Sequence, residues 1–524
     1  MNPSEFPSQA SLYRGGLFGQ LIVDAIQRYG ERVAVIDEAR EYTYAELGQR
    51  IATAIAHLES LGLESGDVVA QLSGNRAETF CIMAAAYVRG LCSVTLHPMA
   101  SAQDHIDVLS DCRPKVFISE STYAARAEQL RHDGADIPHW YSHDTSAYLP
   151  CFWLEAQAQA ARPLKAQGEA ESIIRLAYTG GTTGRSKGVM LSNRAMLTNA
   201  QLWLAGLPWP DGVRTLCSAP ISHGAGSLIV PTLVRGGAVV LERGFDKDKW
   251  LATVATHRIQ FTFMVPTMVQ ALLEYTATQQ ADCSSLQALI YGAAPMSPAR
   301  IKQSLQVFGP VMVQSYGQTE APNTILLLNQ HDHTQADERR LASAGRPFPG
   351  VEVSLRNDDG TAVAPGEIGE ICVRGPLLMS GYHAQPQQTE AAFEYGWLHT
   401  GDLAKQDDTG YFYIVDRKKD LIISGGFNVY AREVEDALMT HPAVNAVAVI
   451  GVPDAKWGEA VKAVVVLRNG AQADATTLME HVRARKGAIG TPKSIAFVDA
   501  LPVTGLGKPD KKALRQQYAV TPAV

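Results

Sequence analysis

A short run of small and basic residues, from Tyr178 to Gly188, has the composition of a phosphate-binding loop. Glycines let backbone amides approach a phosphate, threonine hydroxyls donate further hydrogen bonds, and a lysine supplies positive charge. An apolar segment typical of a strand, residues 173–177, precedes the run. The run is not a Walker loop, because Arg185 stands where that pattern has its lysine. The residues suited to this chemistry are Thr179, Gly180, Gly181, Thr182, Thr183, Gly184 and Lys187.

Four later segments also carry groups suited to a nucleotide. In residues 314–320, Tyr316 could stack on a base, and Thr319 and Glu320 could reach a phosphate and Mg²⁺. Asp402 could accept hydrogen bonds from both ribose hydroxyls. Residues 416–430 join a dense charge cluster to a glycine pair, and residues 502–508 hold a lysine on a glycine-flanked loop. Each segment alone also fits a core tyrosine, a turn aspartate or a solvated surface, so only their combination is informative.

Length and composition limit the classes of protein that these segments can belong to. The chain has 524 residues, 46% of them hydrophobic and 19% charged, which is ordinary globular composition for two to four domains or subdomains. The net charge of −7 gives no support for a nucleic-acid partner. None of the seven cysteines forms a Cys-x-x-Cys pair, which argues against zinc-ribbon and thioredoxin-like proteins. No apolar run of transmembrane length and no targeting segment is evident, so a cytoplasmic protein with buried free thiols is expected.

The elements that must position these segments alternate between helix and strand. A capping box at Thr43–Glu46 predicts a helix over residues 44–61, and a second helix is expected over 77–88. Strands are expected at 68–72, 93–96, 116–119, 237–241 and 261–265. This pattern predicts an α/β fold with mainly parallel sheets. From residue 351 onward, turn signals at 357–360 and 407–410 indicate an antiparallel or barrel-like part. A helix over 433–438 and strands at 446–452 and 461–467 then suggest a small α+β domain.

Together the five segments resemble those of the adenylate-forming superfamily, which includes acyl-CoA synthetases, luciferases and peptide-synthetase adenylation domains. They occur in the order of that family, from residue 178 to residue 508. The resemblance implies a large N-terminal domain of α/β subdomains plus a β-barrel-like subdomain over residues 1–418. It also implies a small, mobile α+β domain over residues 419–524, which rotates about Lys419 between two half-reactions.

The resemblance implies a role for each matching residue. Lys187 and the loop 179–184 match a triphosphate cradle, Glu320 a Mg²⁺-associated carboxylate, and Lys508 the lysine that bridges the substrate carboxylate and the α-phosphate. The predicted catalytic residues are Lys508, Glu320, Thr183 and His223. The predicted contacts to adenine, ribose and CoA, with the hinge, are Gly292, Ala293, Ala294, Pro295, Ser315, Tyr316, Gly317, Thr319, Asp402, Arg417, Lys419, Gly425, Gly426 and Trp457.

The resemblance predicts an AMP-forming acyl-CoA synthetase that uses ATP, Mg²⁺ and CoA. Residues 220–226 contain no acid where peptide-synthetase domains place one, so an amino-acid substrate is disfavoured. His223 matches a gate beside the acyl pocket, and Gly224, Ala225 and Gly226 are expected to leave volume for a bulky or long acyl group. Gly180 and the 416–430 pattern are similar to bacterial fatty-acyl-CoA synthetases. Aryl-acid ligases and acyl-AMP ligases that load a carrier protein remain alternatives. The acid's identity and a homodimer stay open.

Overall fold

The computed structural model describes residues 15–38, 40–179, 186–335, 337–503 and 509–518. The chain divides into two compact units. The first comprises Met1–Glu352 and Arg374–Phe393, and the second comprises Val353–Val373 and Glu394–Val524. The predicted domain boundary at residues 418/419 lies inside the second unit, between its two sheets, and it stays a prediction.

The first unit contains a sheet with nine strands among the described residues, in the order β15-β14-β13-β12-β11-β9-β10-β1-β2. The strands from β1 to β13 along this order pair in parallel, and β2, β14 and β15 add antiparallel edges. Their bounds are β1 Val33–Asp37, β2 Arg40–Thr43, β9 Arg214–Cys217, β10 Ala238–Leu241, β11 Phe261–Met264, β12 Ala288–Gly292, β13 Met312–Gln318, β14 Ala321–Leu328 and β15 Arg346–Pro347. The predicted strands at 237–241 and 261–265 are confirmed.

A second sheet of the same unit has seven strands in the described ranges, in the order β18-β8-β7-β4-β3-β5-β6. The strands from β7 to β6 pair in parallel, and β8 and β18 continue the sheet antiparallel. Their bounds are β3 Val68–Leu72, β4 Cys92–Thr95, β5 Val116–Ser119, β6 His139–Ser142, β7 Ile173–Thr179, β8 Lys187–Ser192 and β18 Gly381–Tyr382. The predicted α/β class with mainly parallel sheets is confirmed.

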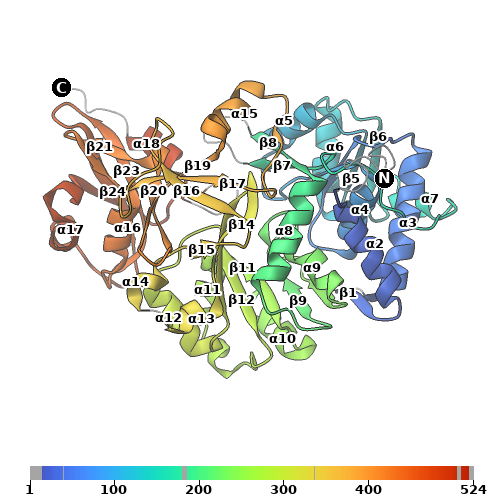
Figure 1. Ribbon diagram of the computed structural model, residues 1–524, viewed down its shortest axis with the longest axis horizontal. Helices are drawn as coiled ribbons and strands as arrows, with labels where there is room; N and C mark the ends of the chain where they lie inside the picture. The colour runs from blue at the N-terminus through green and yellow to red at the C-terminus, as the bar shows by residue number, and fades with distance from the viewer. Residues whose placement is uncertain (1–14, 39, 180–185, 336, 504–508, 519–524) are drawn as a thin grey trace, which may run out of the picture. The chain divides into compact units, whose positions relative to one another are not determined.

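Helices cover both sheets (Figure 1). Around the nine-stranded sheet, Trp250 of α10, Leu272 of α11 and Ile301 of α12 join one buried apolar cluster. Burying side chains of this size contributes about 1.5–3 kcal/mol each. Helices α5 and α6 pack on the seven-stranded sheet, and α8 contacts strands of both sheets. The main helices of this unit are α2 Phe18–Tyr29, α3 Tyr44–Ser60, α4 Ala77–Arg89, α5 Ala102–Cys112, α6 Ala124–His132, α7 Phe152–Ala156, α8 Asn193–Gly206, α9 Ile229–Val234, α10 Lys247–His257, α11 Pro266–Leu273, α12 Pro298–Phe308, α13 Gln330–Gln335, α14 Glu338–Leu341 and α15 Pro386–Ala392.

The second unit contains two further sheets. The part predicted to be antiparallel or barrel-like is a four-stranded sheet in the described residues, ordered β16-β17-β19-β20, with β16 and β20 at its edges. The other sheet carries β21 to β25 and is covered by α16 and α17, which bury an apolar cluster against it. The bounds are β16 Glu352–Arg356, β17 Gly369–Arg374, β19 Leu398–Gln406, β20 Phe412–Arg417, β21 Ile422–Ser424, β22 Phe427–Val429, α16 Ala431–Met439, β23 Val444–Asp454, β24 Gly458–Leu467, α17 Ala475–Gly490, β25 Ser494–Phe497 and α18 Lys511–Tyr518.

Two predictions from composition can be compared with this fold. All seven cysteines are free thiols, and five of them are buried. Within the described residues, each helix is too short or too polar to cross a bilayer.

Candidate active site

The predicted phosphate-binding run lies at a β-hairpin of the seven-stranded sheet. β7 ends at Thr179 and β8 begins at Lys187, and these two residues are register partners in an antiparallel pair. The hairpin therefore places Thr179 and Lys187 side by side at the carboxyl end of β7, the edge where α/β sheets bind ligands. The predicted Gly180, Gly181, Thr182, Thr183 and Gly184 lie outside the described residues.

Lys187 and Glu320 meet through Tyr382, a residue that sequence reasoning missed. The Lys187 ammonium lies 4.8 Å from the centroid of the Tyr382 ring. The Tyr382 hydroxyl donates a 2.8 Å hydrogen bond to Glu320 Oε1. Burial, with Glu320 next, raises the pKa of Tyr382 well above its usual range, so the hydroxyl remains a donor at physiological pH. Tyr382 stands 62 positions from Glu320 in the sequence. No local pattern links the two residues.

The Glu320 carboxylate fits a magnesium ion. Glu320 lies in the turn between β13 and β14, and its backbone carbonyl accepts a 2.8 Å hydrogen bond from Met379 N–H. Oε1 is engaged by Tyr382, and within the described ranges no protein donor reaches Oε2. Mg²⁺ prefers carboxylate oxygens and substrate phosphates as ligands, and it usually takes one or two carboxylates. Glu320 is therefore the residue that would hold Mg²⁺, and the ion would supply positive charge for phosphate oxygens.

The two predicted adenine segments lie next to each other at the carboxyl ends of β12 and β13. Gly292 and Ser315 are register partners in that parallel pair. A Cβ on Gly292 would stand 2.6 Å from the Ser315 carbonyl oxygen, so the strands can approach here only because the residue is glycine. Ala293 has a φ of 64°, a left-handed conformation that is uncommon for a non-glycine residue. The structure thus brings the segments 292–295 and 315–319 together.

His223 lies just before the short 3₁₀ helix Gly224–Leu228 and packs against a second histidine. The rings of His97 and His223 meet edge to face, with centroids 5.2 Å apart. Ser222 Oγ lies 2.8 Å from His223 Nδ1. Burial, then His97 and Arg175, lowers the pKa of His223 to about 3, so the imidazole is neutral at pH 7. His97 follows β4, and its sequence signal was a lone histidine before a proline.

The expectation that residues 224–226 leave acyl volume is wrong for both glycines. A Cβ on Gly226 would stand 1.8 Å from the Ile221 carbonyl oxygen, and a Cβ on Gly224 would stand 2.7 Å from the Phe263 ring. The space beside each glycine is therefore already filled by the protein. These glycines allow the 221–228 turn to pack closely against its neighbours, and they do not open a cavity.

In the second unit, Asp402 and Arg417 form an ion pair across two strands. They are register partners in β19 and β20, and Arg417 Nε lies 3.2 Å from Asp402 Oδ1. The Asp402 side chain is 9% exposed, whereas that of Arg417 is 51% exposed. The guanidinium can therefore reach a solvent-borne ligand while the carboxylate is held in place. The structure brings together the two residues predicted for the ribose.

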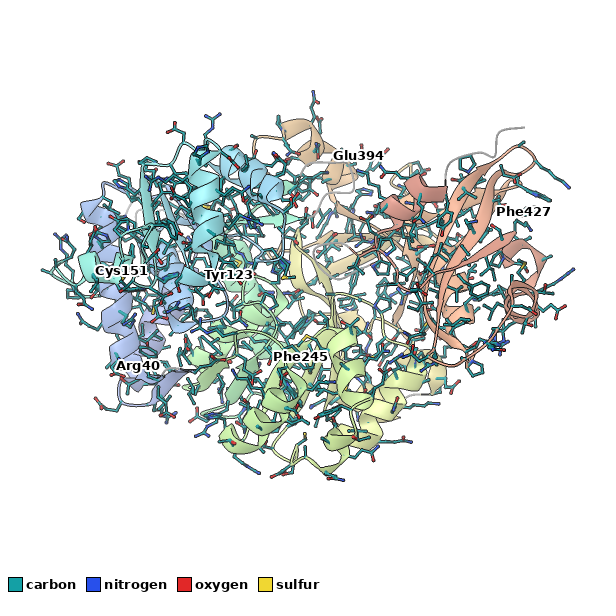
Figure 2. All side chains as sticks on the ribbon, turned by 180° about the vertical axis from the view of Figure 1, so that it is seen from behind. Arg40, Tyr123, Cys151, Phe245, Glu394 and Phe427 are labelled. Carbon is teal, nitrogen blue, oxygen red and sulfur yellow. The ribbon has the colours of Figure 1, made fainter. Side chains whose placement is uncertain are left out.

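The predicted glycine pair is the two-residue turn of the β21–β22 hairpin, since Ser424 pairs with Phe427. Gly425 and Gly426 have φ values of 60° and 81°, as this hairpin turn requires. A Cβ on Gly425 would stand 2.7 Å from the Trp457 indole, and Gly425 N–H donates to the Trp457 carbonyl at 2.8 Å. The exposed Phe427 that follows the turn is labelled in Figure 2. The structure thus brings Gly425 and Trp457 together, while Lys419 lies in the one-turn helix Lys418–Asp420.

Next to Asp402 lies a cluster that sequence reasoning also missed, centred on the buried Glu370. Its carboxylate accepts from Gly401 N–H at 2.9 Å and from Lys418 Nζ at 3.0 Å, and it pairs with His399 Nδ1 at 3.0 Å. Glu370, Cys372 and His399 also have a spacing that could hold a metal ion. However, Lys418 already supplies the positive charge, and burial raises the pKa of Cys372 to about 12. The cluster therefore works as a hydrogen-bonded clamp on the 399–402 strand.

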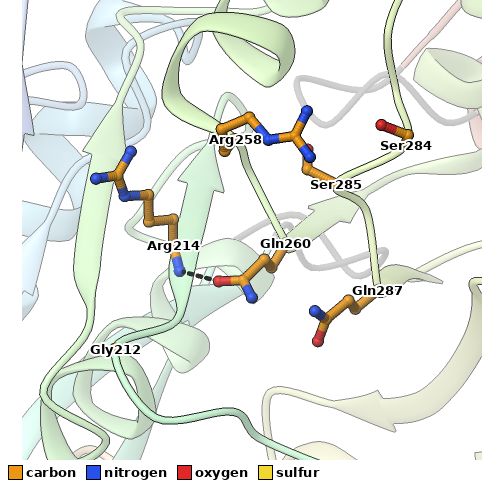
Figure 3. A pocket seen from close by; sticks show the side chains of 7 residues that line it. All are labelled: Gly212, Arg214, Arg258, Gln260, Ser284, Ser285 and Gln287. Carbon is orange, nitrogen blue, oxygen red and sulfur yellow. Dashed lines mark hydrogen bonds between the residues drawn. The ribbon is translucent and has the colours of Figure 1, made fainter.

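A shallow polar depression of about 360 Å³ lies elsewhere on the first unit (Figure 3). It is lined by Arg214, Arg258, Gln260 and Gln287 among others. These residues stand at the amino ends of β9, β11 and β12. The depression is therefore at the strand ends opposite to those that carry the predicted site residues.

Comparison with known proteins agrees with this arrangement. The profile of the AMP-binding enzyme family matches residues 22–383, and that of the AMP-binding enzyme C-terminal domain matches residues 433–508. The chain belongs to the AMP-binding enzyme family. It is 40% identical to the medium/long-chain fatty acid–CoA ligase FadD8 of Mycobacterium tuberculosis, over 95% of this chain and 90% of the relative. It is 37% identical to a feruloyl-CoA synthase of Amycolatopsis, over 91% and 94%.

Among solved structures, the amide bond synthetase McbA of Marinactinospora thermotolerans superposes with a TM-score of 0.88 at 33% identity. The match covers 96% of this chain and 99% of that one. The similarity therefore extends over both units of this family member, and the predicted superfamily is confirmed.

Proposed function

We propose that this AMP-binding enzyme is an ATP-dependent acyl-CoA synthetase. In the first step a carboxylate oxygen attacks the α-phosphorus of ATP, forming acyl-AMP and releasing pyrophosphate. In the second step the CoA sulfur attacks the acyl carbon, and AMP leaves with the electron pair of the broken C–O bond. The observation that carries the proposal is the contact of Lys187 and Glu320 through Tyr382. It places a cation suited to phosphate near a carboxylate suited to Mg²⁺.

The first step needs positive charge around the triphosphate and a fixed nucleoside. Lys187 and the loop 179–184 would bind the phosphates, and Mg²⁺ held by Glu320 would neutralise charge that develops on the phosphate oxygens. Asp402 and Arg417 would contact the ribose, while residues 292–295 and 315–319 would border the adenine. Lys508 would bridge the substrate carboxylate and the α-phosphate. Holding the two reactants in line makes a covalent enzyme intermediate unnecessary.

For the second step we propose rotation about Lys419, which exchanges Lys508 for the Gly425–Gly426 turn. Trp457 is flanked by the ammonium groups of Lys456 and Lys493, at 4.8 and 5.3 Å from its ring. These two charges suit a phosphate-bearing thiol such as CoA. In the arrangement described, the Trp457 indole covers Gly425. The indole would have to move before a pantetheine arm could pass over that glycine.

The substrate we propose is a medium- or long-chain fatty acid or another bulky acid that carries no ammonium group. His223 is neutral at pH 7, and the guanidinium of Arg175 stands near it, so an ammonium group on the substrate would be repelled. An aryl acid is the second candidate, because a feruloyl-CoA synthase is almost as similar to this chain as a fatty acid–CoA ligase. An acyl-AMP ligase that loads a carrier protein is a third. A cytoplasmic location and a homodimer remain predictions.

A panel of carboxylic acids with ATP, Mg²⁺ and CoA tests the proposal. We expect AMP, pyrophosphate and an acyl-CoA in equal amounts, with fatty acids turned over faster than amino acids. Release of ADP would contradict the proposal. Accumulation of acyl-AMP without acylation of CoA would favour the carrier-loading alternative, and a preference for cinnamic or benzoic acids would favour the aryl-acid ligase. A parallel reaction with an amine in place of CoA is the control, because it shows whether acyl transfer requires the CoA thiol.

A further inference from the structure

The segment that carries His223 is held in large part from outside its own sheet. Residues 217–223 leave the carboxyl end of β9 in the nine-stranded sheet. Glu242, just after β10 of the same sheet, binds only the start of the segment, through Ser218 Oγ at 2.7 Å and the Cys217 carbonyl at 3.1 Å. Further contacts come from residues on or next to the seven-stranded sheet: hydrogen bonds from Asn75 and Arg175, and a ring contact from His97. We call residues 217–223 the histidine loop. Its position therefore depends on how the two sheets of the first unit meet.

Asn75 makes the most complete set of contacts with the histidine loop. It lies between β3 and α4 and is 4% exposed. Its Nδ2 donates to the carbonyls of Cys217 and Ala219, at 3.1 and 2.9 Å, and its Oδ1 accepts from Ile221 N–H at 2.9 Å. Three hydrogen bonds to three backbone groups define the amide's orientation and leave the loop little freedom. A side chain that both donates and accepts is required, because the partners are two acceptors and one donor.

Arg175 and His97 hold the end of the same loop. Arg175 of β7 donates from Nη2 to the Ser222 carbonyl at 2.5 Å. Within the described residues, no carboxylate lies within ion-pairing distance of Arg175, so the guanidinium is available to hold this carbonyl. His97 Nδ1 accepts from Met99 N–H at 3.2 Å, which leaves the proton of the neutral ring on Nε2. The His97 ring then packs edge-on against His223.

We propose that Asn75 is a positioning residue that sets the place of His223 and thereby the enzyme's choice of acid. Arg175 assists it at Ser222. The proposal rests on the acyl-CoA synthetase activity proposed above, with His223 beside the acyl group. Among the described residues, the Asn75 side chain forms its hydrogen bonds with residues 217–221 and not with Lys187, Glu320 or Tyr382. Its loss should therefore disturb the use of the acid and leave the use of ATP unchanged.

The substitution Asn75→Asp tests this with almost no change in size. The aspartate keeps the acceptor for Ile221 N–H but turns a second oxygen toward two carbonyl oxygens. When ionised it repels them, and when protonated it can donate to one of them. Burial next to carbonyl oxygens raises the pKa of a carboxyl group. We expect KM for the acid to rise about tenfold at pH 8, with a smaller increase at pH 6, and KM for ATP to stay within twofold.

Asn193→Asp is the matched control. Asn193 is fully buried in the same unit, accepts from Phe18 N–H at 3.0 Å and donates to the Glu169 carbonyl at 3.0 Å. It has the same mixed donor and acceptor set but does not touch the histidine loop. Both variants should lose thermal stability. Only Asn75→Asp should change the ranking of acids in the panel, because only this substitution disturbs the histidine loop.

Hydrogen exchange provides a readout that does not depend on activity. The Ile221 amide is protected by Asn75, so peptides covering residues 217–223 should exchange at least tenfold faster in Asn75→Asp and unchanged in Asn193→Asp. Arg175→Gln, which keeps a donor but shortens the reach, should give a smaller effect in the same direction. Equal shifts in KM for acid and ATP, or an unchanged acid ranking with faster exchange, would overturn the proposal. A wild-type enzyme that activates no acid would instead refute the proposed function.

Discussion

Glu370 and Lys418 should be energetically coupled, and their interaction should stabilise the strand that carries Asp402, the predicted ribose contact. Glu370 is 5% exposed and binds Gly401 N–H, the residue before Asp402, while its other oxygen binds Lys418 Nζ at 3.0 Å. Lys418 is 43% exposed, so the pair is weaker than a fully buried ion pair and stronger than a surface pair. A charge-assisted hydrogen bond contributes about 1.5–3 kcal/mol. After allowance for solvent, we expect a coupling energy of about 1.5 kcal/mol.

A double-mutant cycle of Glu370→Gln, Lys418→Met and both together measures this coupling. The quantity compared is the local opening free energy from hydrogen exchange of the Gly401 amide, because it reports on this strand in the intact two-unit chain. Asp358, the other acid on Lys418, is 85% exposed and provides the control. Asp358→Asn combined with Lys418→Met should be nearly additive. Additivity within about 0.3 kcal/mol for Glu370 and Lys418 as well would refute the clamp.

Three further outcomes are expected. Lys508→Ala should abolish adenylation, measured as pyrophosphate release, but should retain thioester formation from supplied acyl-AMP. Equal loss of both half-reactions would contradict two separate conformations. Tyr382→Phe should lower kcat/KM for MgATP about tenfold, since it removes a hydrogen bond to the charged Glu320; an unchanged Mg²⁺ titration would argue against Glu320 as the magnesium ligand. Asp144 forms two 2.8 Å hydrogen bonds with Arg76, which hold its pKa far below the usual range. Asp144→Asn should therefore lower the free energy of unfolding at pH 7, and this loss should become smaller as the pH falls below about 4. Urea unfolding at several pH values measures the loss. A loss that does not change with pH would exclude the ion pair as its cause.

Much of the fold could be predicted because its signals are local. The capping box at Thr43–Glu46 exists, with Glu46 N–H donating to Thr43 Oγ1 at 3.1 Å, and the helix runs Tyr44–Ser60. The strand at 68–72 has the predicted bounds because a buried parallel strand is mostly apolar, and only Gln71 interrupts the apolar residues here. The sheet order could not be predicted. It depends on pairings such as β8 with β18, whose residues 189 and 382 lie far apart in the chain.

The candidate site divides in the same way. Lys187, Glu320 and Asp402 could be named as candidates because each belongs to a short segment whose composition already suggests its chemistry. Tyr382 and Glu370 were missed because their role is created by contacts across 62 positions and across 29 or more positions, respectively. A lone tyrosine or glutamate in a strand gives no sign of the partner that the fold will bring to it.

The acyl side shows why the acid is harder to predict than the nucleotide. Small residues at 224 and 226 suggested space, but each glycine is packed against the protein, so residue size alone misidentified a turn as a cavity. The groups that fix His223 instead come from Asn75 and Arg175, 146 positions from Ile221 and 47 from Ser222. Changes at such positions can move His223 without altering any segment that binds ATP. Acid preference can therefore change among enzymes that share every nucleotide motif, and its determinants should be sought where the two sheets of the first unit meet.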